Sequence, residues 1–166
     1  EDLNQRLYHY WALGHIHQRE QLSDMPVINY PGNIQGRHFN ELGEKGCLLV
    51  EGDHLKLTTQ FYPTQFIKFE EATIETDHTS KQGLYDVIQS FKDKVRTEGK
   101  SFYRLNVRIN SEDIIAPQDL IQLKEMITEF EENENQFVFI EDLNLQYVQN
   151  DEMPIVKEFS PELLDD

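Results

Sequence analysis

The sequence predicts an α+β (mixed α/β) fold, and three observations support that prediction. Residues 1–53 contain short apolar runs separated by glycine-rich turns, a pattern typical of strands. The pattern changes near Gly52–Asp53. In the segments that follow, apolar residues recur either at every second position, as in strands, or at helical spacing. The later order, strand–strand–helix–strand–helix–strand, is that of a small sheet covered by two helices. We therefore expect two domains, residues 1–53 and 54–149, followed by an acidic linker and the start of a truncated helix in residues 150–166.

Three strands are expected in the first domain, in residues 10–13, 26–30 and 47–52. Pro31-Gly32 suits a turn that needs a positive φ at its second central residue. The single cysteine, Cys47, cannot form an internal disulfide and opens an apolar run. We interpret it as a small core residue of a protein in a reducing compartment, and expect a cytoplasmic location.

The second domain opens with an alternating strand and a further strand through residues 66–75. Residues at helical spacing then predict a helix with Thr79 or Ser80 as its N-cap and Gly99 as its stop. Residues 101–110 alternate strictly and predict a strand. Pro117 opens a second helix, and residues 136–148 predict the last strand. The expected inward-facing residues are Leu55, Leu57, Thr59 and Phe61 on the first strand, Leu84, Ile88, Phe91 and Val95 on the first helix, Tyr103, Leu105, Val107 and Ile109 on the alternating strand, and Leu120, Leu123, Ile127 and Phe130 on the second helix.

Composition excludes some classes of function. The apolar runs are all shorter than the roughly 20 residues that cross a bilayer, so we expect no membrane association. The net charge of −16 repels phosphate backbones, so any nucleic-acid contact has to be local. The opening lacks methionine, a basic region and an apolar core, which suggests a piece of a longer protein rather than a signal peptide.

Two histidines, His15 and His17, follow the first strand after Gly14. In an extended segment, residues two apart project to the same side, so both imidazoles would face one point. Neutral imidazoles bind Mn, Fe, Zn or Ni, and the pair would form half of a metal site. The alternative is a pair of loop histidines bonded to backbone groups and water.

The surroundings of this pair resemble the last conserved block of the calcineurin-like metallophosphoesterases. The stretches "YWALGHIH", "YPGN" and "EKGCLLVE" occur in the family's order, with Gly14–His17, Tyr30–Asn33 and Glu44–Val50 as the matching residues. The branch that the chain is most similar to is the SbcD-like DNA repair exonucleases, including the YhaO-type bacterial proteins. Residues 54–149 resemble the capping domain of these nucleases mainly in layout, although "TTQFYPTQFIKFE" is similar to its opening.

The resemblance implies a metal-dependent DNA exonuclease with two divalent ions, usually Mn²⁺ in this branch, of which His15 and His17 would each serve one. It also implies a β-sandwich catalytic domain ending near residue 53, a cap that presents DNA, and a coiled-coil ATPase partner of the SbcC type. The family's other ligand motifs (Asp-x-His, Gly-Asp, Asn-His-Asp/Glu and a further histidine) are absent from this sequence. We therefore expect a C-terminal fragment that is inactive by itself.

Other residues carry weaker hypotheses. Asn33, Gln35, Arg37 and His38 form a polar loop that could contact substrate, or could be an ordinary solvated loop. Arg104 and Arg108 share one strand face, where pairing with nearby acids is favoured over contact with DNA.

Three further hypotheses concern the whole chain: one about its oligomeric state and two about its function. Unpartnered strand edges in residues 1–53 would favour a homodimer. The acidic surface would also suit a non-catalytic module that binds protein. The metal motif would equally suit a metallophosphoesterase acting on a small phosphodiester or a phosphoprotein.

Overall fold

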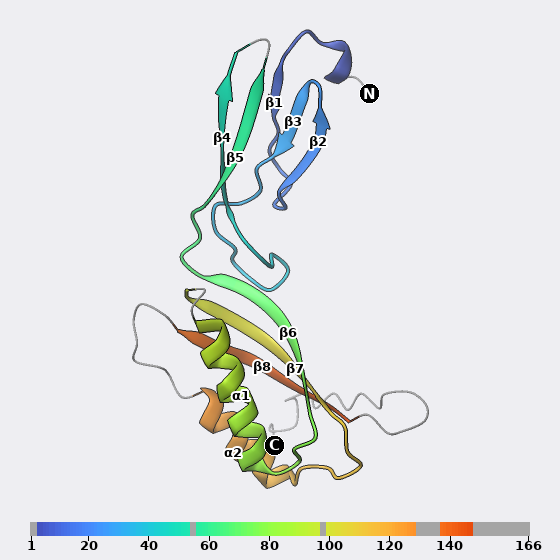
Figure 1. The fold of residues 1–166 in the computed structure, drawn as a ribbon, viewed down its shortest axis with the longest axis vertical. Coiled ribbons are helices and arrows are strands. Elements are labelled where there is room, and N and C mark those ends of the chain that lie inside the picture. Colours follow the sequence, from blue (N-terminus) through green and yellow to red (C-terminus); the bar gives the residue numbers. More distant parts are fainter. Residues whose placement is uncertain (1–2, 54–55, 97–98, 129–136, 148–166) are drawn as a thin grey trace, which may run out of the picture. The chain divides into compact units, whose positions relative to one another are not determined.

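The computed structural model describes residues 3–53, 56–96, 99–128 and 137–147 (Figure 1). These residues form eight strands, two α-helices and a short 3₁₀ helix, Leu3–Gln5, so the predicted mixed α+β fold is confirmed. The chain divides into two compact units, residues 1–70 and 71–166.

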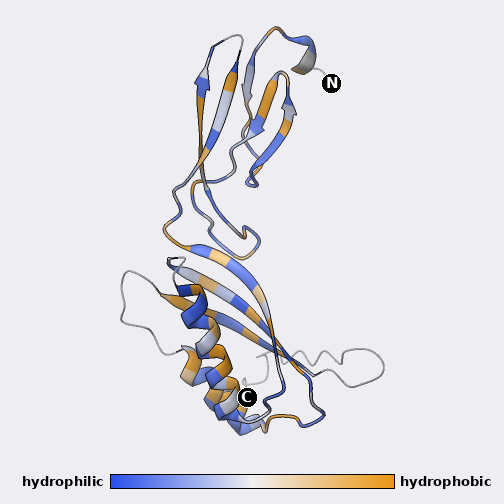
Figure 2. Cartoon of the chain, in the orientation of Figure 1, coloured by the Kyte–Doolittle hydropathy of each residue, from blue (hydrophilic) through white to orange (hydrophobic). Residues whose placement is uncertain are grey.

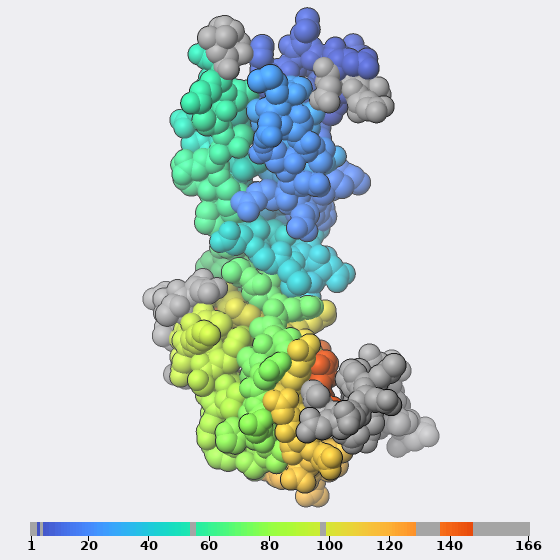
Figure 3. Space-filling view, turned by 45° about the vertical axis from the view of Figure 1, so that its right-hand side comes forward, coloured from blue at the N-terminus to red at the C-terminus, as the bar shows by residue number. Residues whose placement is uncertain are grey.

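The first unit contains a three-stranded sheet in the order β1-β3-β2, formed by β1 (Tyr10–Ala12), β2 (Glu20–Asp24) and β3 (Val27–Tyr30). The central strand β3 runs parallel to β1 and antiparallel to β2. Strands β1 and β3 were expected, whereas β2 was not. The side chains of β2 are almost all exposed and largely hydrophilic, so the strand has no apolar alternation; its strand conformation comes from backbone pairing with β3 (Figures 2 and 3).

The first unit also contains an antiparallel hairpin of β4 (Gly46–Gly52) and β5 (Leu57–Pro63). Leu57, Thr59 and Phe61 lie on the partly covered face of β5, as the alternation predicted. Cys47 is exposed, so its interpretation as a core residue is wrong. The pleat places the two neighbours of Cys47, Gly46 and Leu48, on the covered face of β4 and therefore turns the thiol outward.

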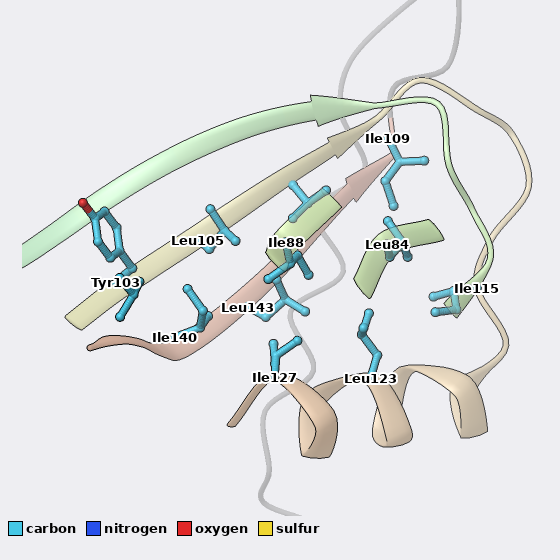
Figure 4. Packing of buried hydrophobic residues seen from close by; sticks show 12 residues of the cluster. Leu84, Ile88, Tyr103, Leu105, Ile109, Ile115, Leu123, Ile127, Ile140 and Leu143 are labelled. Atoms are coloured by element: carbon cyan, nitrogen blue, oxygen red, sulfur yellow. The ribbon is translucent and has the colours of Figure 1, made fainter. Parts of the chain in front are cut away.

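The second unit is a three-stranded sheet covered by two helices. Its strands are β6 (Lys68–Thr76), β7 (Ser101–Ile109) and β8 (Val138–Tyr147), in the order β6-β7-β8, and their arrows point the same way (Figure 4). Helix α1 (Lys81–Val95) joins β6 to β7, and α2 (Pro117–Thr128) joins β7 to β8. These bounds follow the predicted element order, because each element carries a clear apolar period.

One apolar cluster fills the space between this sheet and its helices (Figure 4). Leu84 and Ile88 of α1 and Leu123 and Ile127 of α2 are at most 1% exposed, and they pack with Leu105 and its neighbours on the strands. The alternation predicted for β7 is confirmed, because Tyr103, Leu105, Val107 and Ile109 are all buried. Burial of each such side chain contributes about 1.5–3 kcal/mol.

The ends of α1 confirm one predicted signal and correct another. The Ser80 hydroxyl accepts a hydrogen bond from Gly83 N at 3.2 Å, which makes Ser80 the N-cap. The helix ends at Val95 with Arg96 as its C-cap, so it stops before Gly99, the predicted stop. Gly99 has a φ of +102° and lies in the connection to β7. Phe130 lies outside the described residues.

The observed division of the chain lies further along than the expected boundary at residue 53. Strand β5 pairs with β4 along its whole length, which places Leu57–Pro63 in the first unit, and the division falls within β6. The identification of the units as a catalytic-domain edge and a cap stays a prediction. The expected segment at residues 150–166 lies outside the described residues. The helices that the structure describes are too short or too polar to cross a membrane.

Candidate functional site

The two candidate metal ligands lie in the connection between β1 and β2. Both His15 and His17 are exposed. His15 has a φ of +81°, which is uncommon for a residue with a side chain and costs about 1–3 kcal/mol. The segment is therefore not extended, and the inference that strand alternation turns both rings to one side is wrong. The left-handed conformation in this segment falls on His15 rather than on a glycine.

The turn after β3 packs directly against the backbone of this histidine segment. Gly32 has the positive φ that Pro31-Gly32 predicted, at +78°. A Cβ at this position would lie 2.9 Å from both Arg19 N and His17 O, so only glycine fits without displacement. Asn33 N donates to His17 O at 3.1 Å, which ties the turn to the histidine.

A buried carboxylate, Glu41, connects the histidine segment to the polar loop. Its side chain is 5% exposed, and its Oε1 lies 2.6 Å from His17 Nδ1. Asn33 Nδ2 donates to the same oxygen at 3.0 Å, and Arg37 N donates to Oε2 at 3.0 Å. Arg37 Nη2 lies 3.5 Å and His38 Nε2 4.0 Å from Oε1. We call these five residues the Glu41 cluster.

The environment of Glu41 stabilises its ionised form. Burial by itself raises the pKa of the carboxyl group, but the hydrogen bonds from Arg37 N, the His17 ring and the Arg37 side chain, together with the Arg37 charge, lower that pKa to about 2. Glu41 is therefore a carboxylate near neutral pH and only accepts hydrogen bonds.

The loop that carries Arg37 and Glu41 is held in place by packing and by a side-chain amide. Phe39 is buried and packs edge-to-face on Phe69, with ring centroids 5.1 Å apart. Gln35 Nε2 donates to Gly36 O at 2.7 Å and to Ile67 O at 2.8 Å, while its Oε1 accepts from Phe66 N at 2.6 Å. Gln35 therefore connects the loop to the chain that follows β5. All these contacts are to backbone atoms, as in a structural brace.

Four of the six predicted site residues thus meet, and they meet at a residue that was not predicted. His17, Asn33, Arg37 and His38 surround Glu41, whereas His15 and Gln35 take no part in the hydrogen bonds and ion pairs described for it. Glu41 was missed because its partners are distant in sequence, up to 24 residues away, and because it is one of many acids in the chain. The local signals are its spacings from Arg37, i,i+4, and from His38, i,i+3.

The donor chemistry of the cluster fits one end of a metal site. With Nδ1 of His17 bonded to a carboxylate, Nε2 is left to bind a cation, and carboxylate–histidine–metal arrangements are common in metal sites. Within residues 3–53, 56–96, 99–128 and 137–147, no three His, Cys, Asp or Glu side chains are grouped so as to hold a metal ion. A metal site at His15 and His17 therefore stays a prediction.

Arg104 and Arg108 of the second unit pair with nearby acids, which was the favoured prediction. Arg104 Nη1 lies 3.7 Å from Glu71 Oε1, and Arg108 Nη1 lies 3.4 Å from Glu75 Oε1. Pairing with acids on the neighbouring strand is therefore confirmed. These pairs are about half exposed or more, so each contributes at most about 1 kcal/mol.

Comparison with known proteins links the chain to phosphoester chemistry. No family model matches the chain. It is 35% identical over 101 residues to the uncharacterized metallophosphoesterase YhaO of Bacillus subtilis strain 168. The match covers 60% of this chain and 25% of YhaO, so the chain spans about a quarter of the length of this curated relative. The similarity supports the resemblance to metallophosphoesterases that the sequence motifs indicated.

Proposed function

We propose that this chain is the C-terminal part of a metal-dependent phosphodiesterase that cleaves DNA, to which it contributes metal ligands and a capping unit. The observation that carries the proposal is the His17–Glu41 pair: an exposed imidazole whose Nδ1 is bonded to a buried carboxylate 2.6 Å away. An imidazole of a solvated loop has no need of such a partner. Similarity to a metallophosphoesterase supports the same chemistry.

Four residues have a role in this proposal. His17, through Nε2, and His15 would hold the divalent ions together with ligands from the rest of the protein. When bound, such ions act as Lewis acids on a phosphoryl oxygen and lower the pKa of water. Arg37 would bind a phosphate oxygen, because its side chain is 65% exposed and lies beside Glu41. Asn33 donates its amide to Glu41 and supports the carboxylate.

DNA is the proposed substrate because the sequence motifs resemble those of the SbcD-like nucleases. Within this chain, the net charge of −16 and the pairing of Arg104 and Arg108 with acids disfavour DNA contact elsewhere, so we propose contact at the Glu41 cluster, where Arg37 is exposed. The same two observations favour a second candidate, a phosphoesterase acting on a small phosphodiester. Use of Mn²⁺, an ATPase partner of the SbcC type and a homodimer remain predictions.

The test compares His17→Ala with His78→Ala in the full-length protein supplied with Mn²⁺. His78 is an exposed histidine of the second unit, so its replacement controls for loss of an imidazole. We expect His17→Ala to lower cleavage of linear duplex DNA at least 100-fold and His78→Ala to change it less than twofold.

Two substrates separate the parts of the proposal. Full activity of His17→Ala on both duplex DNA and a small aryl phosphodiester would overturn the assignment of the site. Cleavage of the small diester alone by the unsubstituted protein would support the second candidate and exclude DNA as substrate.

A further inference from the structure

The Glu41 cluster contains a carboxylate that the metal-ligand motif does not include. Glu41 is 5% exposed, and four hydrogen bonds, from His17, Asn33 and Arg37, end on its two oxygens. Burial of a carboxylate is costly unless such bonds offset it. A residue that only closed a surface loop would not require burial or a contact with a histidine 24 residues away.

The contact with Glu41 determines which nitrogen of His17 is available. A carboxylate has no proton to donate, so the short bond requires the hydrogen to be on Nδ1 of the ring. In the neutral imidazole the lone pair is then on Nε2, the atom on the far side of the ring. Without Glu41 the proton would be free to exchange between the two nitrogens, and the ring would be free to rotate.

The other donors hold the carboxylate itself in place. Oε1 accepts from Asn33 Nδ2 as well as from His17, and Oε2 accepts from Arg37 N. The backbone of Asn33 in turn donates to His17 O, so the histidine is held through both its ring and its main chain. Because Glu41 is only 5% exposed and its Oε1 already accepts from two donors, it acts on the site through His17 rather than as a ligand.

We propose that Glu41 is the positioning residue of the metal site: it fixes His17 in the tautomer whose Nε2 binds the metal, and it holds Arg37 beside that ring. This inference rests on the proposed function for the identity of the bound ion. The orientation of the imidazole follows from contacts within the first unit and is measurable without any activity.

The primary measurement is the tautomer of His17 in the metal-free, full-length protein, labelled with ¹⁵N-histidine and recorded at about pH 8.5, where an ordinary imidazole is neutral. The His17 signals are assigned by their loss in His17→Gln. We expect the proton on Nδ1 in the unsubstituted protein. A proton on Nε2 there would overturn the proposal without requiring any variant to fold.

Substitutions of Glu41 extend the test. In Glu41→Ala we expect His17 to show a mixture of tautomers and the affinity for Mn²⁺, measured by calorimetric titration, to fall about 10–100-fold. In Glu41→Gln the amide oxygen can still accept from Nδ1–H, so the tautomer should persist and the affinity should fall less. The matched control is Glu51→Gln, at an exposed position of β4, which should leave both readouts unchanged.

The outcomes separate this inference from the proposed function. An unchanged tautomer and an affinity within twofold in folded Glu41→Ala would overturn the positioning role. If the unsubstituted protein binds Mn²⁺ with the predicted tautomer but cleaves neither DNA nor a small phosphodiester, the proposed function fails while the role of Glu41 stands.

Discussion

The interior of each of the two units is stabilised by a different kind of interaction. In the second unit a contiguous apolar cluster packs two helices on a sheet. In the first, the buried side chains include Ile28 and Phe39, but also Asn29, Glu41 and Lys45. Apolar packing tolerates exchange of similar side chains, whereas buried polar groups require specific partners at specific distances. The candidate site therefore lies in a unit where a buried carboxylate is held by individual hydrogen bonds.

The largest expected effect tests the apolar half of this comparison. Leu123 is fully buried between α2 and the sheet, so Leu123→Ala should lower the free energy of unfolding of the second unit by about 2–5 kcal/mol through lost burial and a cavity. Denaturant unfolding followed by circular dichroism measures this change. Ile121→Ala on the same helix, at a side chain that is 60% exposed, is the control and should change little. A loss equal to that of the control would contradict the assignment of the core.

A smaller effect is expected from the amide that braces the polar loop. Gln35→Ala removes the partners of Phe66 N and of the carbonyl groups of Gly36 and Ile67, which should cost about 1–3 kcal/mol. Trp11, the single tryptophan of the chain, reports unfolding of the first unit by fluorescence. Exposed Gln60 on β5 supplies the control, Gln60→Ala. Unchanged stability with weakened substrate binding would return Gln35 to the substrate-binding role predicted from the sequence.

The smallest effect is expected on lowering the pH, because only part of the stability that Glu41 contributes is lost within the accessible pH range. The pKa of Glu41 is lowered from 4.5 to about 2, so its contribution to stability is fully present above pH 4.5 and is lost as the pH falls towards 2. The accessible part of this pH range is roughly pH 4.5 to pH 3. Over that range the free energy of unfolding should fall more steeply with decreasing pH in the unsubstituted chain than in Glu41→Gln. Parallel curves, followed by Trp11 fluorescence, would show that Glu41 has an ordinary pKa.

The difference between the units also explains what could be predicted from sequence. Strand β7 and helix α1 were predicted because their apolar residues recur with a fixed period that burial imposes. Strand β2 was missed because backbone pairing leaves no such period. Cys47 was misplaced because an unbroken apolar run does not reveal which of its residues face inward.

Four members of the candidate site were predicted, but its central residue, Glu41, and its organisation were not. His17 and Arg37 stood out by residue type and neighbours, and the structure brings both to Glu41. The role of Glu41 depends on contacts between segments far apart in the chain, and the left-handed backbone of His15 has no local signal in its residue type. Such features arise from tertiary contacts, which a local pattern does not encode.

The contact made by Gly32 has a consequence for how this region could vary. Any other residue at position 32 would place a Cβ atom 2.9 Å from both Arg19 N and His17 O, where glycine has only a hydrogen atom. A bulkier residue would push the two loops apart, lengthen the link from Asn33 to His17 and pass that displacement through the amide of Asn33 to the carboxylate. The spacing of the His17 imidazole and the Glu41 carboxylate thus depends on Gly32, a residue without a functional side chain.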